Sequence, residues 1–188
     1  GDKAKPFGIH SWGYNMCASN SESRSFMLGY VHEMMRDFYP NSDGLLIESS
    51  DYAVCYCEEC GEKFFDHEFQ LVKKISSDIW SGNPDATVLV YPRYFVNDEV
   101  PGLGVPGSRH EFDSRWSLFF TPHSAHVDKE LVSKAKSSIW WDDSPALRRP
   151  QDVQRNAKIA QAAGVSGYVP SLETFSYFAT QPEEGQPW

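Results

Sequence analysis

The chain has 188 residues, of which 40% are hydrophobic and 23% are charged. This length allows one well-buried core and is short for two independent domains. The formal net charge of −9, with Lys and Arg scattered along the chain, argues against nucleic acid as a partner. No apolar run approaches the roughly 20 residues that a membrane helix needs, so we expect no membrane span.

The predicted elements alternate between short apolar strands and longer amphipathic helices. Strands are expected at residues 7–12, 44–50, 87–95, 116–124, 137–145 and 165–175. Helices are expected at residues 21–40, 62–80, 128–136 and 149–164. In the first helix, aromatic and apolar residues recur every four positions at Phe26, Tyr30, Met34 and Phe38. Residues 96–113 are rich in Gly, Pro and charge, and we interpret them as a long loop insertion.

This alternation predicts an α/β fold, with parallel strands joined by helical crossovers. An open doubly wound sheet and a barrel both fit that description. The glycine-rich turn of a dinucleotide-binding sheet is missing, and the strand ends carry the polar residues typical of a barrel rim. A whole barrel needs about 250 residues. We therefore expect a parallel (β/α) TIM-type barrel, or most of one, as a single domain over residues 1–188 with about six βα units visible.

Acidic residues follow several of the predicted strands, and a parallel barrel brings strand ends together on one face. The candidate catalytic residues are Glu48, Asp51, Asp142 and Glu173. Two carboxylates that face each other among aromatic rings are what glycosidic bond cleavage requires. Simpler roles are open for two of them, since Glu48 can pair with Arg93 and Asp51 can cap the turn that follows its strand.

Other side chains at the strand ends are suited to binding a sugar, because planar rings stack on the apolar faces of pyranoses. The candidate substrate-binding residues are His10, Trp12, Tyr91, Arg93, Trp140 and Tyr177. We expect the aromatic rings to stack on the sugar, and Arg93 to orient the substrate or pair with a carboxylate.

The four cysteines of the chain are Cys17, Cys55, Cys57 and Cys60, and the last three form a C-x-C-x-x-C loop. Neighbouring strands of a parallel barrel would place the loop of Cys17 beside this loop. Four thiolates in a tetrahedral arrangement make a structural zinc site that is closed to substrate. Disulfide pairing of Cys17 with one of the other three, and unpaired reduced thiols, are the alternatives.

The stretch DGLLIESSDYAVCYCEEC, followed by a helix and PDATVLVYPRYF, resembles the central part of bacterial TIM-barrel glycosidase-like proteins related to alpha-glucuronidases and beta-hexosaminidases. The later WWDDSP and GYVPSLETFSY resemble late barrel strands of that group, and the likeness covers about residues 7–178. The resemblance implies a carbohydrate-active barrel with Glu48 at the acidic strand end. The adjacent Asp-Glu pair of the hexosaminidases is absent, because the strand reads IESSD, which argues against a substrate-assisted mechanism on N-acetyl sugars.

The leading hypothesis is a glycoside hydrolase that cleaves a complex polysaccharide with the pair Glu48 and Glu173. Its partner would be an oligo- or polysaccharide, and its cofactor a structural zinc ion. One alternative is a non-catalytic carbohydrate-binding barrel. Another is a metal-dependent hydrolase that uses the histidines His10, His123 and His126 with Asp142. We expect a periplasmic or secreted protein, although the chain begins at Gly1 without a charged-then-apolar signal segment.

Overall fold

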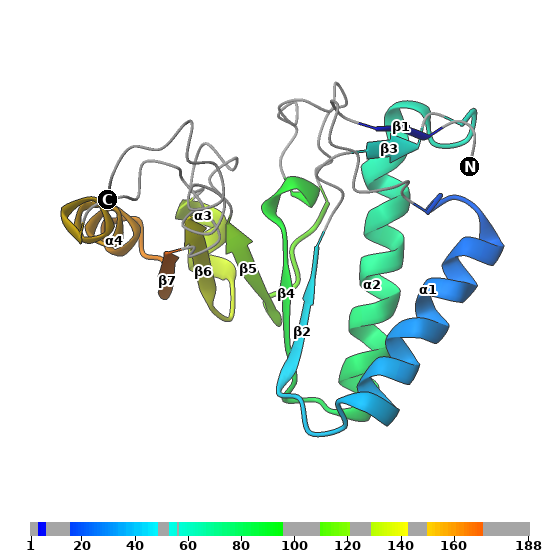
Figure 1. Cartoon of the computed structure of the whole chain (residues 1–188), viewed down its shortest axis with the longest axis horizontal. Helices are drawn as coiled ribbons and strands as arrows, with labels where there is room; N and C mark the ends of the chain where they lie inside the picture. Colours follow the sequence, from blue (N-terminus) through cyan, green and yellow to red (C-terminus); the bar gives the residue numbers. More distant parts are fainter. Residues whose placement is uncertain are drawn as a thin grey trace, which may run out of the picture. The chain divides into compact units, whose positions relative to one another are not determined.

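The computed structural model describes residues 4–6, 16–48, 53–55, 57–95, 110–120, 129–142 and 150–170. The chain forms two compact units, Gly1–Phe112 and Asp113–Trp188, and helices alternate with strands in both (Figure 1). Most of the predicted 96–113 insertion lies outside the described residues, as does the first predicted strand at 7–12. The expectation of a single domain over the whole chain stays a prediction.

The first unit contains two long helices beside a short parallel pair of strands (Figure 1). Its elements are β1 (Ala4–Pro6), α1 (Ser21–Glu33) with a π-helical turn (Met34–Phe38), β2 (Gly44–Ile47), β3 (Ala53–Cys55), a 3₁₀ turn (Gly61–Lys63), α2 (Phe64–Gly82), β4 (Thr87–Val90) and a 3₁₀ turn (Pro92–Tyr94). Strand β4 is shorter than the predicted 87–95, because Pro92 lacks a backbone N–H and begins the 3₁₀ turn.

Strands β2 and β4 pair in parallel, with Gly44 opposite Thr87 and Ile47 opposite Val90. A Cβ atom at Gly44 would overlap the backbone carbonyl of Thr87, so the start of this pair requires glycine. In addition, β1 and β3 form an antiparallel pair that places Ala4 opposite Cys55. This second pair was not predicted from the sequence.

Helix α2 supplies the core of the first unit, because its apolar residues recur on one face. Its buried residues are Phe64, Phe65, Phe69, Leu71, Val72, Ile75, Ser76, Ile79 and Trp80. The ring of Phe69 stacks on that of His110 at 3.9 Å between centroids, and Tyr94 lies near both Phe65 and Phe69. This aromatic cluster joins α2 to the segment after β4.

Helix α1 is predicted correctly as an element, but none of its residues is buried. Three residues of the predicted four-residue repeat stay open to solvent, with Phe26 64%, Tyr30 58% and Phe38 69% exposed, and the fourth, Met34, is half-buried. Asn20 caps the helix, because its side chain accepts a hydrogen bond from the Ser23 N–H at 3.0 Å.

In its described residues, the second unit contains three parallel strands and two helices. Its elements are β5 (Trp116–Phe120), α3 (Lys129–Lys134), β6 (Ser138–Asp142), α4 (Pro150–Ala162) and β7 (Gly167–Pro170). Strand β6 pairs with both β5 and β7 in parallel. Pro150 begins α4, and Gly164 follows its end with a positive φ of 83°, the positions that these two residues favour at helix ends. The Val165 N–H closes the helix by bonding to the Ala160 carbonyl at 3.0 Å.

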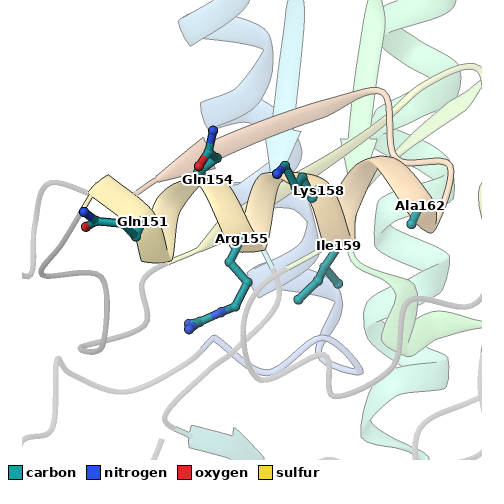
Figure 2. A pocket seen from close by; sticks show the side chains of 6 residues that line it. All are labelled: Gln151, Gln154, Arg155, Lys158, Ile159 and Ala162. Atoms are coloured by element: carbon teal, nitrogen blue, oxygen red, sulfur yellow. The ribbon is translucent and has the colours of Figure 1, made fainter.

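The outer face of α4 borders a shallow, open hollow of about 390 Å³. Figure 2 shows the side chains that line it, which are Gln151, Gln154, Arg155, Lys158, Ile159 and Ala162. All of them come from one helix, so the hollow is a surface feature rather than an enclosed cavity.

The α/β class with parallel strands is confirmed: β2 pairs with β4 in the first unit, and β5, β6 and β7 pair in chain order in the second. The antiparallel β1–β3 pair departs from the predicted parallel arrangement. Across the ranges that the structure describes, the parallel strands form an open arrangement, and no pairing closes them into a barrel. No helix in these ranges is both long enough and apolar enough to pass through a membrane.

Candidate metal centre and strand-end site

The four cysteines come from three short segments of the first unit. Cys17 precedes α1, Cys55 ends β3, and Cys57 and Cys60 belong to the turn that leads into α2. In Figure 1 the starts of both helices and the β1–β3 pair lie at the end of this unit toward which β2 and β4 point. In β/α folds, the carboxyl ends of parallel strands mark the functional edge.

The sulfur atoms of these cysteines form one cluster. The Sγ atom of Cys17 lies 3.7 Å from that of Cys57 and 3.7 Å from that of Cys60. All four sulfur atoms lie within 4.8 Å of one another, and all four cysteines are free of disulfides. The cluster is partly buried, since Cys55 and Cys60 are buried while Cys17 and Cys57 are half-buried.

These distances distinguish a metal site from a disulfide. A disulfide holds its sulfur atoms about 2.05 Å apart. Four sulfur atoms placed tetrahedrally at about 2.3 Å from a zinc ion lie about 3.8 Å from one another. The observed 3.7 Å between Cys17 and its two neighbours fits the tetrahedron. The chemistry of four cysteine ligands also fits zinc, which thiolates bind in closed structural sites.

Short backbone turns hold the cysteines in place. The Asn20 N–H donates to the Cys17 carbonyl at 3.1 Å, and the Gly61 N–H donates to the Cys57 carbonyl at 2.9 Å. Gly61 has a positive φ of 44°, which a glycine adopts without strain. The Cys60 N–H also donates to the Cys57 sulfur at 3.4 Å.

The surroundings shift the thiol pKa values in opposite directions. The hydrogen bond from the Cys60 N–H lowers the pKa of Cys57 to about 6. Burial raises the pKa of Cys60 to about 12 and also raises that of Cys55. Burial likewise acts to raise the pKa of Cys17, but hydrogen bonds from Ser19 and Cys55 outweigh it and lower the value. Cys57 is therefore the thiol most readily converted to the thiolate that a metal binds.

Glu48 directly follows β2, and its exposed side chain contacts a residue that follows β4. The hydroxyl of Tyr91 donates a hydrogen bond to Glu48 Oε1 at 3.3 Å. Tyr91 is 0% exposed, so its ring has no free face on which a sugar can stack. This differs from the stacking role expected from the sequence, and indicates instead that Tyr91 orients Glu48.

Asp142 ends β6 in the second unit and is only 1% exposed. Its Oδ2 atom accepts hydrogen bonds from Tyr168 on β7 and from Asn156 on α4, both at 2.7 Å. Burial, together with the hydrogen bond and charge of Asp142, raises the pKa of Tyr168. Trp140 is half-buried beside Tyr168, with the two rings edge-on at 6.0 Å.

The remaining predicted site residues lie outside the described part of the chain. These are His10, Trp12, Asp51, Glu173 and Tyr177, together with the side chain of Arg93. The histidines His123 and His126 of the alternative metal hydrolase lie there as well. The structure thus brings together the four cysteines, and separately Glu48 with Tyr91.

Two polar groups near these sites were not predicted from the sequence. The Ser19 hydroxyl contacts three of the four sulfur atoms, and Asn156 contacts Asp142. The small residues that follow Cys17 in the stretch CASN were a signal that Ser19 could lie close to the sulfur atoms. No local pattern links Asn156 to Asp142, which lies 14 residues earlier on another element.

Fold and geometry together define an α/β chain with a candidate four-cysteine metal centre. Comparison with protein-family models, curated proteins and solved structures gives no match.

Proposed function

We propose that the chain is a carbohydrate-active hydrolase with a structural zinc centre beside its active site. Cys17, Cys55, Cys57 and Cys60 bind the ion. The proposal is supported by the 3.7 Å sulfur spacings and by the absence of a disulfide among these cysteines. Four cysteine ligands fill the coordination sphere of zinc, so the ion stabilises structure and leaves no open position for a substrate.

The zinc ion would fasten the loop that follows β2. Cys55 lies eight residues after Ile47, the last residue of that strand, and Cys60 leads into α2. Cys17 adds the segment that precedes α1. The ion would thereby tie one predicted strand-end loop to the starts of two helices.

The observation that carries the hydrolase proposal is the hydrogen bond from Tyr91 to Glu48. The two residues follow paired parallel strands, which is where β/α enzymes place catalytic groups. Glu48 is exposed and can reach a substrate, while Tyr91 is fixed in the core. The hydroxyl of Tyr91 holds the carboxyl group of Glu48 in place at the strand end. This suits Glu48 to act as the nucleophile or base, with Glu173 as the acid.

The other parts of the proposal depend on the resemblance to glycosidase-like barrels. The parallel strands would belong to a partial (β/α) barrel, and the substrate would be a complex oligo- or polysaccharide. A periplasmic or secreted location fits that substrate. Trp12, Trp140 and Tyr177 would stack on the sugar, and His10 and Arg93 would contact its polar groups. Asp142, which is buried and accepts hydrogen bonds from Asn156 and Tyr168, would position β7 and α4.

Turnover of aryl glycosides and of acidic oligosaccharides by the purified protein tests the hydrolase proposal. Glu48→Gln should reduce turnover on the order of 10²-fold, since it removes the ionised group and keeps the shape. A parent protein that binds oligosaccharides without cleaving them would favour the non-catalytic binding barrel instead.

A further inference from the structure

Ser19 lies two residues after Cys17, and its hydroxyl faces the sulfur cluster. The Oγ atom is 3.1 Å from the Cys17 sulfur, 3.3 Å from that of Cys60 and 3.7 Å from that of Cys57. These three sulfur atoms come from two segments of the chain, so the hydroxyl contacts ligands of both segments rather than a single one.

The hydroxyl is available as a donor once a metal is bound. Four thiolates complete the tetrahedral ligand set of zinc, so a serine oxygen is not needed as a fifth ligand. Four thiolates around a dication also leave excess negative charge, which hydrogen-bond donors stabilise. The Cys60 N–H provides one such donor to the Cys57 sulfur. The shortest contact of Ser19 is to Cys17, the ligand of its own segment.

The backbone around Ser19 is fixed before any metal binds. Arg24 donates from Nη1 to the Ser19 carbonyl at 3.1 Å and to the Ala18 carbonyl at 3.2 Å. Ala18 is buried, and the Asn20 N–H closes the turn onto the Cys17 carbonyl. The hydroxyl is thereby held toward the sulfur atoms by interactions that do not involve the metal, which reduces the entropic cost of placing it.

We propose that Ser19 is a positioning residue of the metal centre, whose hydroxyl donates a hydrogen bond to the thiolates, chiefly to Cys17, and so strengthens zinc binding. The inference rests on the proposed zinc centre. Partners that hydrogen-bond to metal ligands typically contribute about 10- to 100-fold to metal affinity. We expect the loss of the hydroxyl to weaken zinc binding by a factor in that range.

The test compares Ser19→Ala, which removes the hydroxyl, with Ser19→Thr, which keeps one. Ser21→Ala is the matched control, because it is the same substitution two residues away, at an exposed position. Zinc affinity is measured by competition with a chromophoric chelator. Cobalt(II) then replaces zinc, and the energy of its thiolate-to-metal charge-transfer band is recorded. Removing a hydrogen bond raises the energy of the sulfur lone pairs, so the band should move to lower energy.

Weaker zinc binding and a lower-energy band in Ser19→Ala, with recovery in Ser19→Thr and no change in Ser21→Ala, would support the inference. Unchanged affinity in Ser19→Ala would overturn it while leaving the zinc centre intact. Weaker binding with an unshifted band would also overturn it, because the serine would then act through packing alone. A parent protein that binds neither zinc nor cobalt would overturn the zinc centre itself, and the inference with it.

Discussion

The sulfur atoms of Cys17 and Cys57 lie 3.7 Å apart, although 40 residues separate the two cysteines along the chain. The spacing is far too long for a disulfide and close to the sulfur–sulfur distance in a tetrahedral zinc–thiolate site. The pair therefore joins the segment before α1 to the turn before α2. A metal ion at this point would couple the starts of both helices and the loop that follows β2.

Replacing Cys57 with serine should abolish tight zinc binding, because it removes one of the four ligands. Elemental analysis should find about one zinc per chain in the parent protein and much less in Cys57→Ser. The variant should also unfold at a lower temperature, since metal binding to the folded state alone contributes to stability.

Ser21→Ala should retain the zinc content and melting temperature of the parent, because this side chain is exposed. Returning zinc to the chelated parent at about 100 times its dissociation constant should add about 2.7 kcal/mol to the free energy of unfolding. Mass spectrometry that found two disulfides and no metal would contradict the zinc centre.

Replacing Gly44 with alanine should destabilise the first unit. The new Cβ atom would overlap the backbone carbonyl of Thr87, so β2 and β4 would have to separate at that point. Gly29→Ala is the matched control, because nothing lies within 4 Å of a Cβ atom at this helical position. The control should gain about 0.5–1 kcal/mol in the free energy of unfolding, since alanine favours a helix over glycine. Urea denaturation measures the free energy of unfolding of both variants. Equal stability of the two variants would argue against the β2–β4 pairing.

Removing the Tyr168 hydroxyl should change how stability depends on pH. Burial and Asp142 raise the pKa of Tyr168 above its ordinary value of 10.0. A raised pKa means that the folded protein holds this proton more tightly than the unfolded chain. The resulting stability is fully present below pH 10.0 and is lost as the pH rises further.

Tyr168→Phe should therefore be less stable than the parent at pH 8, by about 1.5–3 kcal/mol for a hydrogen bond to a charged group. The difference should shrink as the pH rises beyond 10.0. Urea denaturation at several pH values measures this difference in the free energy of unfolding. Tyr39→Phe is the control, because Tyr39 is 62% exposed and should follow the parent at every pH. A constant difference between Tyr168→Phe and the parent would contradict the role of this proton.

The sequence predicted the elements well because hydrophobic periodicity reports secondary structure directly. It could not predict the β1–β3 pair, since three-residue strands such as Ala53–Cys55 carry no measurable period. Periodicity also shows which residues of α1 share a face but not whether anything covers it. Phe26 and Phe38 accordingly keep the predicted spacing and yet remain exposed.

The candidate site was predictable to the extent that it depended on spacing along the chain. The C-x-C-x-x-C loop and the position of Cys17 after the preceding predicted strand indicated one cluster, and the structure contains it. The roles of Tyr91 and Ser19 depend on three-dimensional contacts that no sequence spacing specifies. A strand-end tyrosine fits equally well on a sugar or in a core, and only burial distinguishes the two.

The contact between Tyr91 and Glu48 allows a matched pair of variants to test the hydrolase proposal. Tyr91→Phe keeps the buried ring and removes only the hydroxyl that donates to Glu48. Tyr94→Phe is the control, because Tyr94 is equally buried and its hydroxyl donates instead to Glu68 at 2.9 Å.

If Glu48 is the catalytic carboxylate, Tyr91→Phe should lower kcat more than Tyr94→Phe, although both variants lose one buried hydroxyl. A hydrogen bond to a charged group contributes about 1.5–3 kcal/mol, so the expected loss in kcat is roughly 10- to 100-fold. Tyr94→Phe should keep kcat closer to that of the parent, because its hydroxyl contacts Glu68 and not Glu48. Equal kcat values for both variants would remove Tyr91 from the site, and with it the observation on which the assignment of Glu48 rests.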